Sequence, residues 1–588
     1  MAQVISIGKQ DFLYLRKNNY FYIDKTDFIR QWWESADDIT LITRPRRFGK
    51  TLNMSMLNYF FSRQYEDCGQ FFEGLSIWKN EKYRKLQGTY PVISVSFADV
   101  KQNNYKDAVQ KIKNIIVDVY RQHRYLLEQE CFTENEKNRM LSVTEKMDDV
   151  TAQDALKELS YYLKLYYGKN VLILLDEYDT PMQEAYVHGY WEKFTGFMRS
   201  LFNAAFKTNP YLERAVMTGI TRVSKESVFS DLNNLVVITT TSEQYADCFG
   251  FTEKEVFEAL EAFGMADKKS VVKKWYDGFT FGTEKDIYNP WSITNYLKEK
   301  KLKPYWAATS SNGLISKLLQ TASANMKKQM ECLLQGGQIT VNFDEQIVFC
   351  QLEQDECAVW SLLVASGYLK VEEVEYRGMT LEPWYHLSIT NLETVSMFSG
   401  MFKGWFAEAA SNYNEFVKAL LDGDIKAMNL YMNDVALSTF SSFDVGNHAS
   451  KQSRPERFYH GFVLGLLVEV RDCYEVRSNR ESGYGRYDVM LIPKQQGRPA
   501  MILEFKVQAV DEEKTLEDTV EAALAQITEK NYDTELLSIG IPKENIHHYG
   551  FAFQGKKVLF GDGKQYKEGQ NHSAKYRDNL CVRFIKNV

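Results

Sequence analysis

The most constraining feature of the chain is a change of hydrophobic period within residues 38–61, DITLITRPRRFGKTLNMSMLNYFF. Residues 39–42 are mainly apolar, which is typical of a short strand buried on both faces. From Leu52 to Phe60 the apolar residues recur at helical spacing. The intervening loop is short and basic and ends in Gly-Lys-Thr. A strand, a tight loop and a helix in this order predict a phosphate-binding loop at a helix N-terminus.

The loop provides a specific set of candidate nucleotide contacts. Free N–H groups and the helix dipole would hold a phosphate, Lys50 would reach the β- and γ-phosphates, and Thr51 would ligate Mg²⁺. The pattern G-x-x-x-x-G-K-[ST] is incomplete, because Arg44 stands where the first glycine is expected and Pro45 would fix the turn instead. The alternative is a capped surface helix that follows a basic loop. The candidate contacts are Arg47, Phe48, Gly49, Lys50 and Thr51.

A second expected strand ends in carboxylates, within NVLILLDEYDTP (170–181). Residues 171–175 are continuously apolar, and Asp176 and Glu177 follow at the carboxyl end of the strand, where α/β sheets bind their ligands. There Asp176 would contact Mg²⁺, directly or through water, and Glu177 would polarise the attacking water. Asp179 is a third carboxylate, to which the pattern assigns no role. The alternative is an ordinary solvated strand end.

Two further stretches complete the expected N-terminal fold. RAVMTGIT (214–221) is typical of a buried strand, and Arg222 follows it. Arg222 would sense the γ-phosphate or act in trans; an ordinary surface arginine is the alternative. YPVISVSFAD (90–99) supplies another strand of parallel type. With helices between the strands, the patterns predict an αβα sandwich and thus an α/β fold.

Near the C-terminus, GRYDVMLIPKQQGRPAMILEFKV (485–507) predicts a β-hairpin. A three-residue loop with Gly497 in the left-handed conformation gives paired residue numbers that sum to 992. This register places Asp488 opposite Glu504, and Lys506 shares their face because side chains alternate along a strand. A register slip of one residue would send Asp488 to the other face.

The three charged groups of the hairpin suggest a metal site. Two adjacent carboxylates repel each other, and a bound Mg²⁺ or Mn²⁺ would relieve this repulsion. Asp488 and Glu504 would hold the metal, which activates water and stabilises charge on a phosphodiester, and Lys506 would position that water. The alternative is a salt-bridged hairpin in which Lys506 merely neutralises Glu504.

Several of these stretches resemble one known family. YFYIDKTDFIRQW, RPRRFGKT, LLDEYDTP and TGITRVSKESVFSDLNNL are similar to the bacterial AAA-ATPase-like family, whose domain commonly precedes a PD-(D/E)xK nuclease domain. The later stretches that carry the resemblance are WYDGFTFG, IYNPWSITNYL and YWAATSSNGLI for a helical segment, WSLLVASGYLK for a connector, and RFYHGFVLGLL, SNRESGYGRYDVML and ILEFKV for the terminal domain.

The resemblance implies a P-loop NTPase αβα sandwich, a helical middle region and a C-terminal α/β restriction-endonuclease-like domain. It also implies that Glu456, on an expected helix before the hairpin, is an additional acidic metal ligand, and that His460 and Gln526 assist. A dipole partner for Glu456 and a packed role for His460 are the alternatives. The literal proline of PD-(D/E)xK is absent, since Tyr487 precedes Asp488.

Length and composition set the domain plan. At 588 residues the chain is too long for one core. We expect a P-loop domain in 1–250, a helical lid in 251–340, a small α+β adaptor in 341–440 and a nuclease-like domain in 441–588. The net charge of −7 argues against a uniformly basic nucleic-acid binder. No signal peptide or membrane span is evident, so we expect a cytoplasmic protein.

These observations predict an ATPase coupled to a metal-dependent nuclease that acts on DNA or RNA. ATP and Mg²⁺ are the expected cofactors, with Mn²⁺ as an option at the nuclease site. Nucleic acid is the expected partner, no membrane is expected, and homo-oligomerisation is left open. The alternative is an ATP-driven regulatory switch or scaffold whose nuclease-like domain is inactive and only binds a partner.

Overall fold

The computed structural model divides the chain into two compact units, residues 1–322 with 332–397, and residues 323–331 with 398–588. The structure describes all residues except 1–2, 223–228, 230–231, 308–312, 335, 346–351, 353–354, 405–412, 440–462, 464–466, 468–469, 471–472, 479–480, 483–484, 496, 509–512, 555–556 and 563–588. Glu456 and His460 thus fall outside the described residues. In the part that is described, no helix is both long and apolar enough to cross a membrane.

The first unit is built on a five-stranded parallel sheet with the strand order β2-β3-β4-β1-β5. Its strands are β1 (Ile39–Thr43), β2 (Val92–Ser96), β3 (Val171–Asp176), β4 (Leu212–Gly219) and β5 (Leu235–Ile238). β1 and β3 are buried along their whole length, as their continuous apolar runs predict. Parallel strands place their carboxyl ends at one edge, so the phosphate loop after β1, the acidic end of β3 and the exit of β4 meet there.

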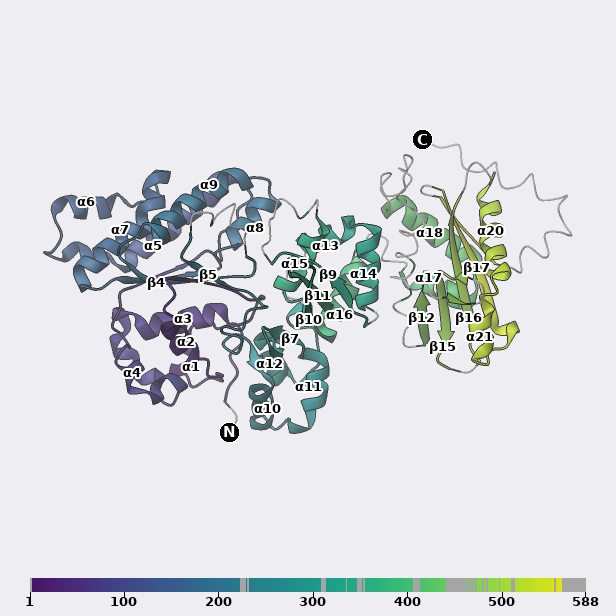
Figure 1. The fold of residues 1–588 in the computed structure, drawn as a ribbon, viewed down its shortest axis with the longest axis horizontal. Helices are drawn as coiled ribbons and strands as arrows, with labels where there is room; N and C mark the ends of the chain where they lie inside the picture. The colour runs from purple at the N-terminus through teal and green to yellow at the C-terminus, as the bar shows by residue number, and fades with distance from the viewer. Residues whose placement is uncertain are drawn as a thin grey trace. The chain divides into compact units, whose positions relative to one another are not determined.

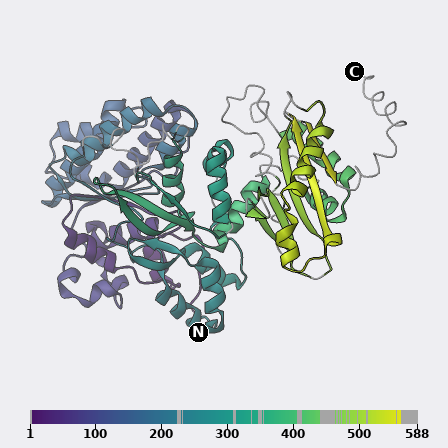
Figure 2. The ribbon, with the colours of Figure 1, turned by 45° about the vertical axis from the view of Figure 1, so that its right-hand side comes forward.

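Helices cover both faces of this sheet, which confirms the predicted αβα sandwich (Figures 1 and 2). The helices on one face are α1 (Phe12–Lys17), α2 (Asp27–Ser35), α3 (Lys50–Phe61) and α4 (Glu81–Arg84). On the other face lie α5 (Tyr105–Gln122), α6 (Glu134–Ser142), α7 (Asp149–Tyr167), α8 (Thr180–Val187) and α9 (Trp191–Phe202). The core beneath α2 and α3 joins Trp32, Leu57 and Phe60 to Leu174 and Val216 of the strands.

The middle of the chain contains the expected helices and a small sheet that the sequence did not predict. The helices are α10 (Glu253–Ala262), α11 (Lys269–Tyr276), α12 (Pro290–Glu299) and α13 (Gly313–Thr321). β6 (Phe251–Thr252), directly before α10, and β7 (Phe279–Phe281) and β8 (Glu284–Tyr288), between α11 and α12, form a sheet of order β6-β8-β7. The stretch WYDGFTFG is the end of α11 followed by β7, and Tyr276 is buried in the local core.

A second small sheet follows, with the order β10-β11-β9. It consists of β9 (Ile339–Val341), β10 (Leu369–Arg377) and β11 (Glu382–Ile389). α15 (Glu356–Ala365) lies between β9 and β10 in the chain, whereas α14 (Ala324–Leu334) and α16 (Leu392–Gly404) each span a boundary between the two units. α17 (Tyr413–Asp422) and α18 (Ile425–Thr439) instead pack their apolar faces on the sheet of the second unit, whose strands follow.

The second unit contains a five-stranded mixed sheet of order β12-β15-β16-β17-β18. Its strands are β12 (Tyr474–Ser478), β15 (Val489–Pro493), β16 (Ala500–Val507), β17 (Ile546–Gln554) and β18 (Lys557–Asp562). β13 (Glu481–Ser482) and β14 (Gly485–Arg486) form a separate ribbon, so β15 begins later than the expected hairpin strand. α20 (Leu516–Glu529) and α21 (Asp533–Ser538) cover the face opposite α17 and α18.

The hairpin between β15 and β16 has the predicted register. Val489 pairs with Leu503 and Leu491 with Met501, which confirms the sum of 992. Gly497 has φ +90°, as the predicted turn requires. Odd-numbered residues of β16 lie in the core under α17 and α18, whereas even-numbered residues such as Ile502 pack under α20 and α21. Alternation therefore assigns Glu504 and Lys506 to the α20 side of the sheet.

Candidate functional site

The phosphate loop has the geometry of a helix-terminal anion site. Gly49 is the N-cap of α3 with φ +82°, a left-handed conformation that suits glycine. Lys50 follows and is only 4% exposed. Its Nζ donates to the carbonyl oxygens of Arg44, at 2.9 Å, and Pro45, at 3.1 Å. The ammonium group is therefore folded back over the loop that would cradle a phosphate.

Thr51 and Asp176 meet at the carboxyl edge of the sheet. Thr51 Oγ1 donates to Asp176 Oδ2 at 2.7 Å, and Thr218 Oγ1 at the end of β4 donates to Asp176 Oδ1. Asp176 is nearly buried, and this burial raises the pKa of its carboxyl, with a further contribution from Glu177. The hydroxyl and carboxylate oxygens form an oxygen-donor set that suits Mg²⁺.

Arg44, which replaces the first glycine of the loop pattern, is a buried side chain. Its guanidinium donates to the carbonyl oxygens of Thr43 and Thr239, at 2.9 and 2.6 Å, and more weakly to those of Gln244 and Tyr245. It also lies 4.5 Å from the centre of the Phe281 ring. Burial lowers the pKa of Arg44 to about 10. Arg44 thus ties the phosphate loop to the segment after β5 through hydrogen bonds to backbone carbonyls.

Arg47 and Phe48 differ from each other in their placement. Arg47 is exposed, has φ +67° and places its guanidinium 4.5 Å from the ring centre of Trp291 in α12. Phe48 is buried against Phe279 and Phe281 of β7. The side chain of Phe48 therefore belongs to the core, and only its backbone remains as a candidate nucleotide contact.

Glu177 and Arg222 flank the same edge of the sheet. Glu177 has φ +55°, an uncommon conformation for a non-glycine residue, and its carboxylate accepts a hydrogen bond from Thr180 Oγ1 at 3.0 Å. Such strain clusters at functional sites. Arg222 is half-buried directly after the exit of β4, and among the described residues it has no hydrogen-bond or ion-pair partner.

The second site lies on the α20 side of the C-terminal sheet. Asp488 immediately precedes β15, and its Oδ2 accepts a hydrogen bond from the backbone N–H of Phe505 at 2.8 Å. Glu504 is 3% exposed and accepts a hydrogen bond from Gln526 Nε2 of α20. Gln526 Nε2 also contacts Tyr532 Oη at 3.3 Å. The register thus brings Asp488 beside Glu504, and Lys506 is half-exposed two residues further along β16.

The structure adds no further candidate ligand or phosphate contact to this site among the residues that it describes. Glu456 and His460 lie outside the described residues. Arg477 on β12, a nearby cation that could hold a phosphate, instead forms ion pairs with Glu535 and with Glu475, the latter at 2.8 Å. These ion pairs account for the Arg477 charge without a phosphate.

Comparison with known proteins identifies a family for the N-terminal and for the C-terminal part of the chain. Residues 6–229 match the AAA-ATPase-like family model, described as a predicted AAA-ATPase, and residues 454–562 match the PD-(D/E)XK nuclease superfamily. The chain carries an AAA-ATPase-like domain and a PD-(D/E)XK nuclease superfamily domain. The "Uncharacterized protein in vnfD 5'region" of Azotobacter chroococcum mcd 1 is 23% identical over 557 residues, which cover 93% of this chain and 96% of that protein.

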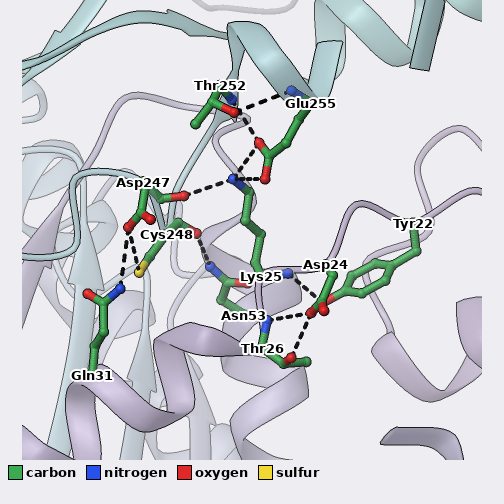
Figure 3. A network of polar contacts seen from close by, with 10 residues as sticks. All are labelled: Tyr22, Asp24, Lys25, Thr26, Gln31, Asn53, Asp247, Cys248, Thr252 and Glu255. Atoms are coloured by element: carbon green, nitrogen blue, oxygen red, sulfur yellow. Dashed lines mark hydrogen bonds and ion pairs between the residues drawn. The ribbon is translucent and has the colours of Figure 1, made fainter. Parts of the chain in front are cut away.

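The AAA-ATPase-like domain is joined to the following helical segment by a polar network around Lys25 (Figure 3). Lys25 Nζ contacts the Asp247 carbonyl oxygen at 2.8 Å and Glu255 Oε2 at 2.7 Å. Asn53 in α3 donates to the Cys248 carbonyl oxygen at 3.0 Å. The stretch YIDKTDF therefore links residues 247–248, to which the phosphate-loop helix also bonds, to the first turn of α10, a structural role that sequence reasoning did not assign.

Sequence reasoning also missed a contact between the phosphate loop and α12. Asn289 caps α12 by accepting a hydrogen bond from Trp291 N at 2.9 Å, and its Nδ2 donates to the Arg46 carbonyl oxygen at 3.3 Å. The only available signal was the Asn-Pro pair of IYNPW, which is typical of a helix start. Nothing in that pair indicates which loop the helix contacts.

Proposed function

We propose that the chain binds and hydrolyses ATP with Mg²⁺ at the phosphate loop, and that this ATPase is coupled to a metal-dependent nuclease that cleaves DNA or RNA phosphodiesters. The observation that carries the proposal is the contact between Thr51 and Asp176 beside the buried Lys50. It places a hydroxyl, a carboxylate and an ammonium group at one helix N-terminus. This combination is what a magnesium nucleotide requires.

At the first site, Thr51 and Asp176 would hold the Mg²⁺, and the loop amides with Lys50 would hold the phosphates. A bound Mg²⁺ neutralises charge on the transferred phosphoryl group. The Lys50 ammonium now donates to loop carbonyls, so phosphate oxygens would take their place as acceptors. Glu177 would orient the attacking water, and Arg222 would contact the γ-phosphate.

At the second site, Asp488 and Glu504 fit a divalent cation because they are neighbouring oxygen donors on one face of the sheet. Gln526 orients Glu504, as groups behind a ligating carboxylate commonly do. A bound metal supplies an activated water and a Lewis acid for the phosphodiester. Lys506 would stabilise charge that develops on the phosphate, and Glu456 remains a further candidate ligand. Such a protein would act away from the membrane.

The ATPase half is tested with the purified full-length protein by binding of labelled ATP in Mg²⁺ and by phosphate release. Lys50→Met should abolish binding, whereas Lys85→Met, at a lysine that is 74% exposed, should leave it unchanged. Normal ATP binding by Lys50→Met would show that the phosphate loop is assigned wrongly.

The nuclease half is tested by nicking of supercoiled plasmid and cleavage of single-stranded RNA in Mg²⁺ or Mn²⁺. Asp488→Asn and Glu504→Gln should both lose cleavage while the fold is retained. Glu517→Gln, at an exposed position of α20, is the matched control and should cleave normally. Cleavage that survives in Asp488→Asn would contradict the metal site. ATP binding by a wild-type protein that cleaves neither substrate would contradict the nuclease half.

A further inference from the structure

Asp179 is the carboxylate to which the sequence pattern assigned no role, and it is completely buried. It occupies the N-cap position of α8, yet its side chain does not cap that helix. Its Oδ2 instead accepts hydrogen bonds from two successive backbone amides beyond β4, those of Ile220 at 3.0 Å and Thr221 at 2.8 Å. Thr221 Oγ1 and Gln183 Nε2 donate to the same oxygen, at 2.8 and 3.0 Å.

The neighbouring residues fix the same segment. Tyr178 Oη donates to the Thr221 carbonyl oxygen at 2.7 Å, and Tyr178 N donates to the Thr218 carbonyl oxygen at 2.9 Å. Gly219 fits only because it has no side chain: a Cβ atom there would lie 2.6 Å from the Tyr178 ring and 2.8 Å from Asp179 Oδ1. Residues 178–179 thus clamp the exit of β4 from one side.

This clamp acts on a segment that matters for the nucleotide site. The exit of β4 begins with Thr218, which donates to Asp176. It continues through Thr221, whose backbone N–H and carbonyl are both hydrogen-bonded by the clamp, to Arg222. Four donors already occupy Oδ2 of Asp179, and its Oδ1, which has no hydrogen-bond partner among the described residues, is buried against Gly219 with no solvent exposure. Asp179 is therefore not placed to ligate a metal or to act as a base toward the nucleotide. Its effect must pass through the backbone that it holds.

Burying a carboxylate is costly unless its hydrogen bonds compensate. Burial raises the pKa of Asp179, and the neighbouring Glu177 raises it further. An apolar residue would satisfy the packing but would leave the amides of Ile220 and Thr221 without an acceptor. A carboxylate at this position therefore maintains one specific conformation of the β4 exit.

We propose that Asp179 is a positioning residue that fixes the β4 exit so that Arg222 meets the γ-phosphate, and that it thereby allows the site to distinguish ATP from ADP. This inference rests on the proposed ATP site and adds the origin of its specificity. ADP lacks the γ-phosphate, so the contact that Asp179 maintains contributes to ATP binding and hydrolysis but not to ADP binding.

The test measures ATPγS and ADP affinities of the full-length protein in Mg²⁺, together with kcat and KM for ATP. Asp179→Asn should weaken ATPγS binding by about tenfold, the size of one lost charge-assisted contact. ADP affinity should stay within about twofold, and kcat should fall more than KM rises. Asp148→Asn, at an N-cap aspartate on the surface, is the matched control. If Asp179→Asn does not fold, Thr221→Val, which removes a single hydroxyl donor, replaces it. It should change ATPγS affinity and kcat in the same direction but by less.

The double variant Asp179→Asn/Arg222→Ala decides whether the effect passes through Arg222. If it does, the double variant should discriminate ATPγS from ADP no worse than Arg222→Ala alone. Additive effects, or an equal loss of ATPγS and ADP affinity, would overturn the inference and leave the ATP site intact. Failure of the wild-type protein to bind either nucleotide would overturn the ATP site itself, and this inference with it.

Discussion

Thr51 Oγ1 donates a hydrogen bond to Asp176 Oδ2 across 2.7 Å, although 125 residues separate the two in the chain. The contact exists because β1 and β3 both end at the same edge of a parallel sheet, with β4 between them. It joins the first turn of α3, the helix after the phosphate loop, to the acidic carboxyl end of β3. The two residues therefore report jointly on the proposed Mg²⁺ site.

Replacing Thr51 with valine should weaken Mg²⁺-dependent ATP binding by about tenfold, because the hydroxyl that would ligate the metal and bond Asp176 is lost. Binding of ATP measured in EDTA should change little. Thr40→Val is the matched control, since the buried Thr40 hydroxyl in β1 has no hydrogen-bond partner among the residues that the structure describes. Titration of labelled ATP with and without Mg²⁺ measures the effect. Equal losses under both conditions would argue against a metal role for Thr51.

The sequence predicted those parts of the fold whose signals are local. Continuous apolar runs identify β1 and β3, and the Gly-Lys-Thr turn after β1 identifies the loop. The hairpin register also followed, because turn geometry and alternation leave few alternatives once Gly497 is placed in the left-handed region. The sequence alone therefore predicted that Asp488 and Glu504 lie side by side in the hairpin.

Other features depend on partners that are distant in the chain. The sequence shows Arg44 only as a departure from the loop pattern, because its carbonyl partner in Thr239 lies 195 residues away. The short strands β6 and β7 have too few residues to show a period. Gln526 was suggested as a helper, but only the packing of α20 shows that Glu504 is its partner. Local pattern carries no information about such contacts.

Restoring the missing glycine with Arg44→Gly should damage the protein and should not improve nucleotide binding. The variant leaves the carbonyls of Thr43 and Thr239 without their donor and opens a cavity beside Phe281. We expect destabilisation of about 3 kcal/mol and weaker ATP binding. Thermal unfolding and ATP titration measure the two effects. An unchanged melting temperature with tighter ATP binding would show that Arg44 is only a substitute for glycine.

Glu393 should make the stability of the first unit depend on pH. Its buried carboxylate accepts hydrogen bonds from Ser292 Oγ at 2.8 Å and Trp306 N at 2.5 Å, and burial raises its pKa to about 7. Between pH 4.5 and pH 7 the folded state keeps a proton that the unfolded state releases, so the free energy of unfolding falls as pH rises through this window. The decrease should be about 3 kcal/mol and should level off above pH 7.

Glu393→Gln should remove this pH dependence, because the amide keeps an acceptor oxygen but does not titrate. Thermal unfolding of wild type and variant between pH 5 and pH 8 measures the difference, which should grow in favour of the variant as pH rises. Glu258→Gln, at a glutamate of α10 that is 64% exposed, is the control and should follow the wild type. Parallel pH profiles for wild type and Glu393→Gln would contradict the prediction.

Asn429 and Asn433 of α18 should protect the outer edge of the C-terminal sheet. Asn429 accepts from Phe560 N at 2.7 Å and donates to the Phe560 carbonyl oxygen at 3.0 Å, and Asn433 does the same with Val558 at 3.2 and 2.8 Å. The two amides thus occupy the backbone groups of β18 as a neighbouring strand would. An uncovered edge strand is a template for association with another chain.

Asn429→Ala should therefore destabilise the second unit by about 2 kcal/mol, the value of two lost hydrogen bonds, and should increase aggregation on heating. The double variant with Asn433→Ala should aggregate at a lower temperature than either single variant. Asn114→Ala, at a helix asparagine that contacts Gln110 one turn away, is the matched control. Light scattering during a thermal ramp, combined with hydrogen exchange of the Val558 and Phe560 amides, measures both effects. Unchanged protection of these amides in the double variant would show that the asparagines do not cover the edge.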